Sequence, residues 1–149
     1  MVRRGESGPR RSHVEGKPKP ARLSTAPTPG VLVIDDNPVL LRSLARLLQI
    51  YGIEVATARD GREGLAKFRR TSPAVVLTDI LMPVQDGFST IIAMRRERPS
   101  VKIIAMSGGT RFGISRSRTI ASGADGVLEK PFDVGELVVM IRRYLTPDA

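Results

Sequence analysis

Five short apolar segments alternate with five segments of helical periodicity from Val31 towards the end of the chain. Each apolar segment is rich in β-branched residues with little polar alternation, which is typical of strands buried on both faces of a sheet. Strands that alternate with helices predict a parallel sheet with right-handed crossovers and helices on both faces. The predicted strands are Val31–Ile34, Ile53–Ala58, Ala74–Thr78, Val101–Met106 and Gly126–Glu129.

The helices are predicted from capping residues and apolar stripes. Asn37, which is followed by proline, is a predicted N-cap, and Asp60, Asp86 and Asp133 are predicted to cap three further helices. A weaker helix is expected from about Phe112 to Ala121. The stripe of the first helix consists of Leu40, Leu41, Leu44, Leu47, Leu48 and Tyr51.

Residues 1–29 differ from the rest because they are rich in Pro, Gly, Ser, Arg and Lys and show no apolar periodicity. Such a segment buries too little apolar surface to offset the entropy of ordering, so we expect a disordered basic tail over residues 1–29 and a folded domain over residues 30–146. The net charge is +9, and more than half of it belongs to the first 30 residues.

The chain has no cysteine, which excludes disulfides and thiolate metal sites. It also has no apolar run of the roughly 20 residues that a membrane span needs, so no membrane partner is expected.

Charged and hydroxyl residues follow four of the predicted strands. Asp35 and Asp36 follow the first strand, Asp79 the third, Ser107 the fourth and Lys130 the fifth. Because the carboxyl ends of parallel strands lie at one edge of a sheet, these side chains are expected to converge there. Three carboxylates in one pocket would repel each other, and a hard cation such as Mg²⁺ removes that repulsion and leaves room for a phosphoryl oxygen. A carboxylate can also act as the nucleophile that forms an acyl phosphate, so the set suits phosphoryl transfer.

Each of these residues also has a purely structural interpretation. Acidic residues after strands often cap the next helix, and a lone serine or lysine is an ordinary surface residue. Asn37 already provides the cap after Asp35 and Asp36, and Asp79 stands seven residues before the predicted cap Asp86. Capping therefore explains these three carboxylates poorly, and the ordered set favours a functional role.

The sequence resembles the receiver domain of two-component response regulators from about Val31 to Leu145. The motifs that carry the resemblance are Val-Leu-Val-Ile-Asp-Asp, Thr-Asp-Ile-Leu-Met-Pro-Val-Gln-Asp-Gly, Met-Ser-Gly and Lys-Pro-Phe, in this order. The resemblance implies an α/β fold, a flavodoxin-like doubly wound five-stranded parallel sheet of order 2-1-3-4-5 with five helices. It also implies a cytoplasmic phosphoprotein of His-to-Asp signal transduction that is a switch and not an enzyme.

The resemblance assigns a phosphoacceptor and a metal site. Asp79 would take a phosphoryl group from the phosphohistidine of a sensor histidine kinase or a histidine phosphotransfer protein. Asp36 and Asp79 would hold Mg²⁺ directly, Asp35 mainly through water, and Leu81 through its backbone carbonyl.

Two further residues are implied to act on the phosphoryl group. Lys130 would pair with it, and the bond from Lys130 to Pro131 is expected to be cis. Ser107 stands where the family has a Thr or Ser that moves toward the phosphoryl oxygens. The family often has Tyr or Phe three residues before the lysine, and here that position is Val127.

Three functions are compatible with these features. A phosphorylation-dependent switch would dock to an unknown downstream protein or relay its phosphoryl group, since the chain ends soon after the last predicted helix. Its docking face could be electropositive, although the same arginines could equally be a solvated surface: Arg116, Arg118, Arg142 and Arg143. A non-phosphorylated receiver-like interaction domain would use its basic tail on nucleic acid or another anionic surface, but the tail has no aromatic residue for base stacking, so nucleic acid is not expected as the main partner. An aspartyl-phosphate hydrolase would resemble Asp-x-Asp-x-Thr after the first strand, where this chain has Asp-Asp-Asn-Pro.

Overall fold

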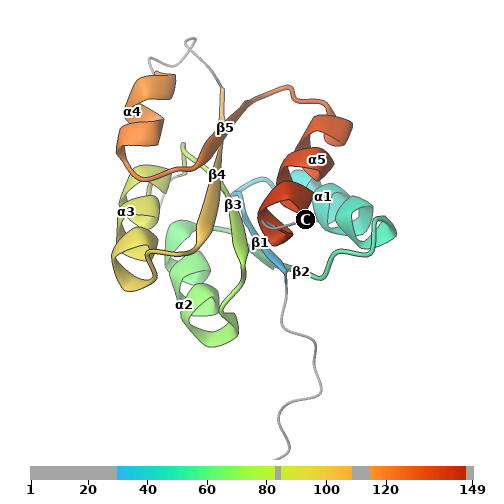
Figure 1. Ribbon diagram of the computed structural model, residues 1–149, viewed down its shortest axis with the longest axis horizontal. Helices are drawn as coiled ribbons and strands as arrows, with labels where there is room; N and C mark the ends of the chain where they lie inside the picture. Colours follow the sequence, from blue (N-terminus) through green and yellow to red (C-terminus); the bar gives the residue numbers. More distant parts are fainter. Residues whose placement is uncertain (1–29, 83–84, 109–114, 147–149) are drawn as a thin grey trace, which may run out of the picture.

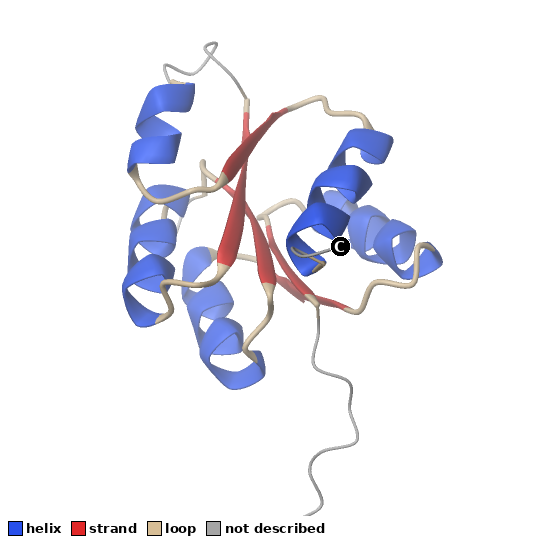
Figure 2. Ribbon diagram, in the orientation of Figure 1, coloured by secondary structure: helices blue, strands red, loops and turns tan. Residues whose placement is uncertain are grey.

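The computed structural model describes residues 30–82, 85–108 and 115–146. One sheet of parallel strands has the order β2-β1-β3-β4-β5, and helices cover both of its faces (Figures 1 and 2). The strands are β1 (Val31–Ile34), β2 (Val55–Ala58), β3 (Val75–Asp79), β4 (Lys102–Ser107) and β5 (Gly126–Glu129). The helices are α1 (Pro38–Ile50), α2 (Gly61–Thr71), α3 (Gly87–Glu97), α4 (Arg116–Ala121) and α5 (Val134–Leu145). The predicted α/β fold and its strand order 2-1-3-4-5 are confirmed.

The central strands are buried on both faces, as their continuous apolar sequence predicts. Successive side chains of a strand point to opposite faces, so β1 divides its residues between two cores. Leu32 and Ile34 join the core beneath α2 and α3, whereas Val31 and Val33 join the core beneath α1 and α5. Figure 1 shows these two helical layers on either side of the sheet.

The predicted caps are confirmed at each of the four positions. Asn37 accepts hydrogen bonds from the N–H groups of Val39 and Leu40, and Asp60, Asp86 and Asp133 each accept one from a backbone N–H in the first turn of their helices. A side-chain oxygen at the N-cap satisfies an N–H that the helix leaves unpaired. These caps fix where α1, α2, α3 and α5 begin.

Some element boundaries and one core residue differ from the prediction. β3 and β4 begin and end one residue later than predicted, so Asp79 and Ser107 are the last residues of their strands. β2 begins at Val55 because the Ile53 N–H still bonds to the Leu48 carbonyl, which closes the end of α1. Tyr51 is not part of the core stripe but an exposed C-cap.

The weak fourth helix is shorter than predicted. Its predicted start near Phe112 lies outside the described residues, and the described helix begins at Arg116 because the Ser115 side chain accepts from the Arg118 N–H as its N-cap. None of the helices in the described ranges is both long and apolar enough to span a bilayer.

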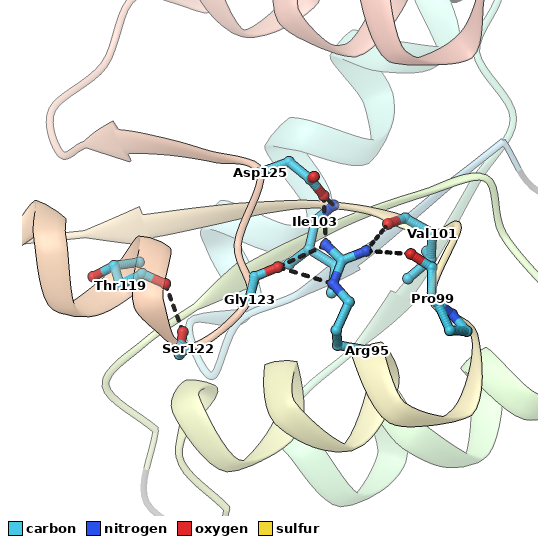
Figure 3. A network of polar contacts seen from close by, with 8 residues as sticks. All are labelled: Arg95, Pro99, Val101, Ile103, Thr119, Ser122, Gly123 and Asp125. Atoms are coloured by element: carbon cyan, nitrogen blue, oxygen red, sulfur yellow. Dashed lines mark hydrogen bonds and ion pairs between the residues drawn. The ribbon is translucent and has the colours of Figure 1, made fainter.

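One arginine at the end of α3 joins three segments that are distant in sequence. The Arg95 guanidinium donates to the carbonyls of Pro99, Val101 and Gly123 and forms an ion pair with Asp125 at 2.6 Å (Figure 3). Asp125 in turn accepts from the Ile103 N–H of β4 at 2.8 Å. The network therefore fixes the segment between α4 and β5 against α3 and the start of β4.

We expect Arg95→Ala to lower the free energy of unfolding by about 2–3 kcal/mol. The substitution leaves partly buried carbonyls and the Asp125 carboxylate without a donor, and such groups cost about 1–3 kcal/mol when unpaired. Urea unfolding measures the change. Arg96→Ala is the matched control, because Arg96 is exposed and a surface substitution should change stability by about 0.5 kcal/mol at most. Equal effects of the two substitutions would contradict this role of Arg95.

Candidate functional site

The predicted functional residues meet at the carboxyl edge of the sheet. Asp35 and Asp36 directly follow β1, Asp79 and Ser107 end β3 and β4, and Lys130 directly follows β5. Adjacent parallel strands β1, β3, β4 and β5 bring these ends side by side. The Lys130 N–H donates to the Ser107 carbonyl at 2.7 Å, which continues the pairing of β4 with β5 to the site.

The three carboxylates form a compact oxygen cluster. One carboxylate oxygen from each of Asp35, Asp36 and Asp79 lies within 4.8 Å of the others. Asp35 and Asp79 are buried, with 1% and 7% of their surface exposed, whereas Asp36 is exposed. The cluster thus has two buried members and one member at the solvent boundary.

Lys130 bridges the two buried carboxylates. Its Nζ lies 2.9 Å from Asp35 Oδ2 and 3.4 Å from Asp79 Oδ2. The other Asp35 oxygen, Oδ1, accepts from the Asn37 N–H at 2.9 Å. Asp35 is therefore held by contacts on both oxygens, and the Lys130 ammonium offsets part of the negative charge.

The site raises the pKa of both Asp79 and Lys130, which disfavours the charged form of Asp79 and favours the charged form of Lys130. Burial raises the pKa of the Asp79 carboxyl; the nearby Lys130 opposes this shift and the Asp35 charge adds to it. Burial tends to lower the pKa of Lys130, but its hydrogen bond to Asp35 and the attraction of Asp79 outweigh burial and raise it. Lys130 is thus held as a cation, while ionised Asp79 pays a cost that a further cation would reduce.

The donor set fits Mg²⁺. This ion prefers carboxylate and carbonyl oxygens and keeps several waters, so a cluster with one exposed side suits it. Leu81 lies in the loop after β3 with about half of its surface exposed, at 49%. The predicted use of its carbonyl, like the metal role of the three aspartates, stays a prediction.

The structure also places the Lys130–Pro131 peptide bond and the side chains of Ser107 and Val127, which the sequence analysis singled out. The Lys130–Pro131 peptide bond is cis, which confirms that prediction. Ser107 is buried, with 3% of its surface exposed, and Val127 in β5 is buried as well. The predicted phosphoryl roles of Ser107 and Lys130 stay predictions.

The structure also shows two features that the sequence did not indicate. Lys130 pairs with Asp35 as well as with Asp79, although the motif implied only a contact with a phosphoryl group. An added Cβ at Gly87 would lie 2.3 Å from the Asp79 carbonyl oxygen, so the first turn of α3 packs directly on the backbone of Asp79. In the sequence, Gly87 is marked only by its position after the cap Asp86 in the Asp-Gly motif. Its close approach to the Asp79 backbone becomes visible only in the folded structure.

We expect metal-free Asp79→Asn to be more stable than the wild type at neutral pH. The folded pKa of Asp79 is raised, so its ionisation costs stability as the pH rises from the unfolded pKa, about 4, through the folded value. Asparagine has no such cost, so its advantage should grow across this window and be absent below it. Urea unfolding at several pH values with a chelator measures this, with Asp60→Asn, which keeps a capping side chain, as control. An Asp79→Asn variant less stable than the wild type at pH 7 would show that ionised Asp79 does not destabilise the fold.

The comparisons with known proteins agree with this geometry. The family model described as "Response regulator receiver domain" matches residues 31–142. The chain belongs to the response regulator receiver domain family. The chain is 39% identical over 118 residues to the transcriptional regulatory protein PrrA of Mycobacterium leprae, covering 79% of this chain and 50% of that protein. It is 36% identical to a probable transcriptional regulator, ycf27, of Porphyridium aerugineum, over 77% of this chain and 47% of that protein. The chain thus spans about half the length of these curated relatives.

Solved receiver structures have the same fold. The Vibrio cholerae chemotaxis protein CheY4 aligns with a TM-score of 0.69 at 33% identity, covering 76% of this chain and 96% of that chain. The response regulator TrrA of Thermotoga maritima, solved in complex with Mg²⁺-BeF, aligns with a TM-score of 0.69 at 31% identity over the same shares. Receiver domains of this family are two-component signalling modules, so the family expectation for this chain is confirmed.

Proposed function

We propose that this receiver domain accepts a phosphoryl group on Asp79, with Mg²⁺ held by Asp35, Asp36, Asp79 and the Leu81 carbonyl. The observation that carries the proposal is the cluster of three carboxylates with oxygens within 4.8 Å of one another. The Lys130 ammonium forms ion pairs with two of these carboxylates, Asp35 and Asp79. A nucleophilic carboxylate beside a cation site and a lysine is the arrangement that acyl-phosphate formation needs.

The chain's own residues account for the positioning in this reaction. An Asp79 oxygen would attack the phosphorus of a phosphohistidine, forming the O–P bond as the N–P bond breaks and the histidine nitrogen leaves with the bonding electron pair. Lys130 would stabilise charge on the phosphoryl oxygens, and Asp35 positions Lys130 through their 2.9 Å contact. Bound Mg²⁺ would supply further charge neutralisation on the equatorial oxygens.

The switch would follow from the added charge. A phosphoryl group on Asp79 is a new anion at a buried edge, and it favours the conformer in which Ser107 and Lys130 donate to it. Position 127 holds valine, so the switch would not use the aromatic side chain that often moves at this position in the family. This step rests on the proposed phosphorylation of Asp79.

The partners are proposed from the family. A sensor histidine kinase or histidine phosphotransfer protein would donate the phosphoryl group in the cytoplasm. The phosphorylated domain would then dock to a downstream protein or relay its phosphoryl group, and the relatives' names, which include transcriptional regulators and a chemotaxis protein, leave that partner's class open. A switch of this kind is modified once per chain and does not turn over a substrate.

Stoichiometry distinguishes this switch from a hydrolase. Incubation with Mg²⁺ and radiolabelled acetyl phosphate should incorporate at most one phosphoryl group per chain, and a chelator should prevent it. The same protein should release no phosphate from a phosphate monoester such as p-nitrophenyl phosphate. Continuous hydrolysis of the monoester over many turnovers would instead support an aspartyl-phosphate hydrolase.

A further inference from the structure

The two edges of the sheet carry opposite charge. Because each helix runs back from the carboxyl edge, α2, α3 and α5 end near the edge where the strands begin (Figure 1). We call this amino edge the basic pole and define it by the cations in the last turns of these helices, the C-cap of α3 and the start of β4. They are Arg69, Arg70, Arg95, Arg96, Arg98, Lys102, Arg142 and Arg143. The acidic residues at this edge are Glu54, Glu97 and Asp125.

The opposite edge, which holds Asp79, is predominantly acidic. Its carboxylates come from the strand ends, the helix caps and the first helical turns: Asp35, Asp36, Asp60, Glu63, Asp79, Asp86, Glu129, Asp133 and Glu136. Fewer cations accompany them, namely Arg59, Arg62, Arg116, Arg118 and Lys130. A polyanion would therefore be attracted to the basic pole and repelled from the phosphoacceptor edge.

Most cations of the basic pole keep their charge uncompensated. Arg69 and Arg95 are neutralised by ion pairs with Glu97 and Asp125. Within the described ranges, Arg70, Arg96 and Arg143 are exposed and form no ion pair.

Arg142 and Lys102 lie against aromatic rings instead of carboxylates. The Arg142 guanidinium is over the Tyr51 ring at 5.4 Å, and Lys102 Nζ lies 5.9 Å from the centre of the Tyr144 ring. These contacts orient the side chains without removing their charge.

A groove with a mixed polar and apolar lining opens at the same edge. Its volume is about 380 Å³, and Arg98 and Lys102 line it together with the hydroxyl-bearing residues Ser72, Ser100 and Tyr144. Cations and hydroxyl donors are the side chains that most often contact phosphate oxygens. Favourable interaction with helix dipoles explains cations in the last turns of helices, but it does not explain this groove.

We propose that the basic pole binds the phosphate backbone of duplex DNA without sequence preference. Backbone contacts need only cations and hydroxyl donors. Arginine predominates at the pole, and its planar fork matches phosphate oxygens. A membrane surface is less well matched, because binding in the lipid interface needs a continuous apolar face, and among the described residues of this edge only Ile50 and Tyr51 are exposed large apolar side chains.

Fluorescence anisotropy of a labelled duplex of roughly 20 base pairs with the full chain tests the proposal. The basic-pole variant carries Arg70→Gln, Arg96→Gln and Arg143→Gln. If each arginine contacts one phosphate, the variant should bind about tenfold or more weakly, and its salt slope should fall by about 3. The matched variant, Arg59→Gln, Arg62→Gln and Arg116→Gln, removes the same charge from the acidic edge and should bind within about twofold of the wild type.

Three results would overturn the proposal. They are equal weakening by the two triple variants, no salt-dependent binding of the duplex by the wild type, and tighter binding to phosphatidylserine vesicles than to the duplex. The test is independent of the proposed phosphorylation, because the basic-pole variant keeps every residue of the Asp79 site. That variant should still incorporate a phosphoryl group from acetyl phosphate, whatever its affinity for DNA.

Discussion

Gly87→Ala is expected to lower the free energy of unfolding by about 3 kcal/mol and to impair phosphoryl acceptance in the same protein. An added Cβ would lie 2.3 Å from the Asp79 carbonyl oxygen and 2.6 Å from the Ile80 Cα. Both are backbone atoms, so relief of the clash must move α3 or the end of β3, whereas a flexible side chain could simply rotate. Overpacking of a core costs about 1–3 kcal/mol, and a clash with backbone belongs at the upper end of that range.

Urea unfolding and labelling by acetyl phosphate measure the two effects of Gly87→Ala. Gly30→Ala is the control, because the nearest atom to its added Cβ is a side-chain carbon of Leu145 at 3.5 Å, an ordinary contact. We expect the control to retain stability and labelling. Wild-type stability in Gly87→Ala would show that the close approach to Asp79 does not constrain the site.

Asp36→Asn is expected to weaken Mg²⁺ binding by about 100-fold while leaving the metal-free fold intact. The substitution removes one anionic ligand from the proposed divalent site, and loss of an outer-shell partner alone typically costs 10–100-fold in metal affinity. Asp36 is exposed, so the stability of the metal-free protein should change by about 0.5 kcal/mol at most. Phosphoryl incorporation at a fixed, subsaturating Mg²⁺ concentration should fall with the affinity.

Titration calorimetry with Mg²⁺ measures the effect of Asp36→Asn directly. Asp86→Asn serves as control, since Asp86 is a carboxylate at the same edge whose capping bond to the Ser89 N–H asparagine can also make. Unchanged Mg²⁺ affinity in Asp36→Asn, or equal loss in the control, would remove Asp36 from the metal site.

The sequence predicted the fold and the position of the site because both depend on local signals. Buried β-branched runs, capping side chains such as Asn37 and Asp60, and the order of strand and helix signals are each read within a few residues. Once the strands are parallel, their carboxyl ends lie at one edge, and Asp35, Asp79 and Lys130 follow from that geometry. The convergence of these residues needed no information about side-chain packing.

The features that were missed depend on contacts between distant segments. Lys130 and Asp35 are 95 positions apart, and Arg95 and Asp125 are 30 positions apart. No local sequence pattern therefore indicates that either pair is in contact. Tyr51 continues the apolar stripe in sequence, yet the helix ends before it and leaves its ring exposed beneath Arg142. The separation of charge into two poles likewise appears only when all the helix ends are placed around one sheet.

Intact mass spectrometry after incubation with Mg²⁺ and acetyl phosphate determines whether Asp79 is the phosphoacceptor. We expect one added phosphoryl group on the wild type and none on Asp79→Asn or on the wild type with a chelator. A phosphoryl group on Asp79→Asn would show that another residue is the acceptor.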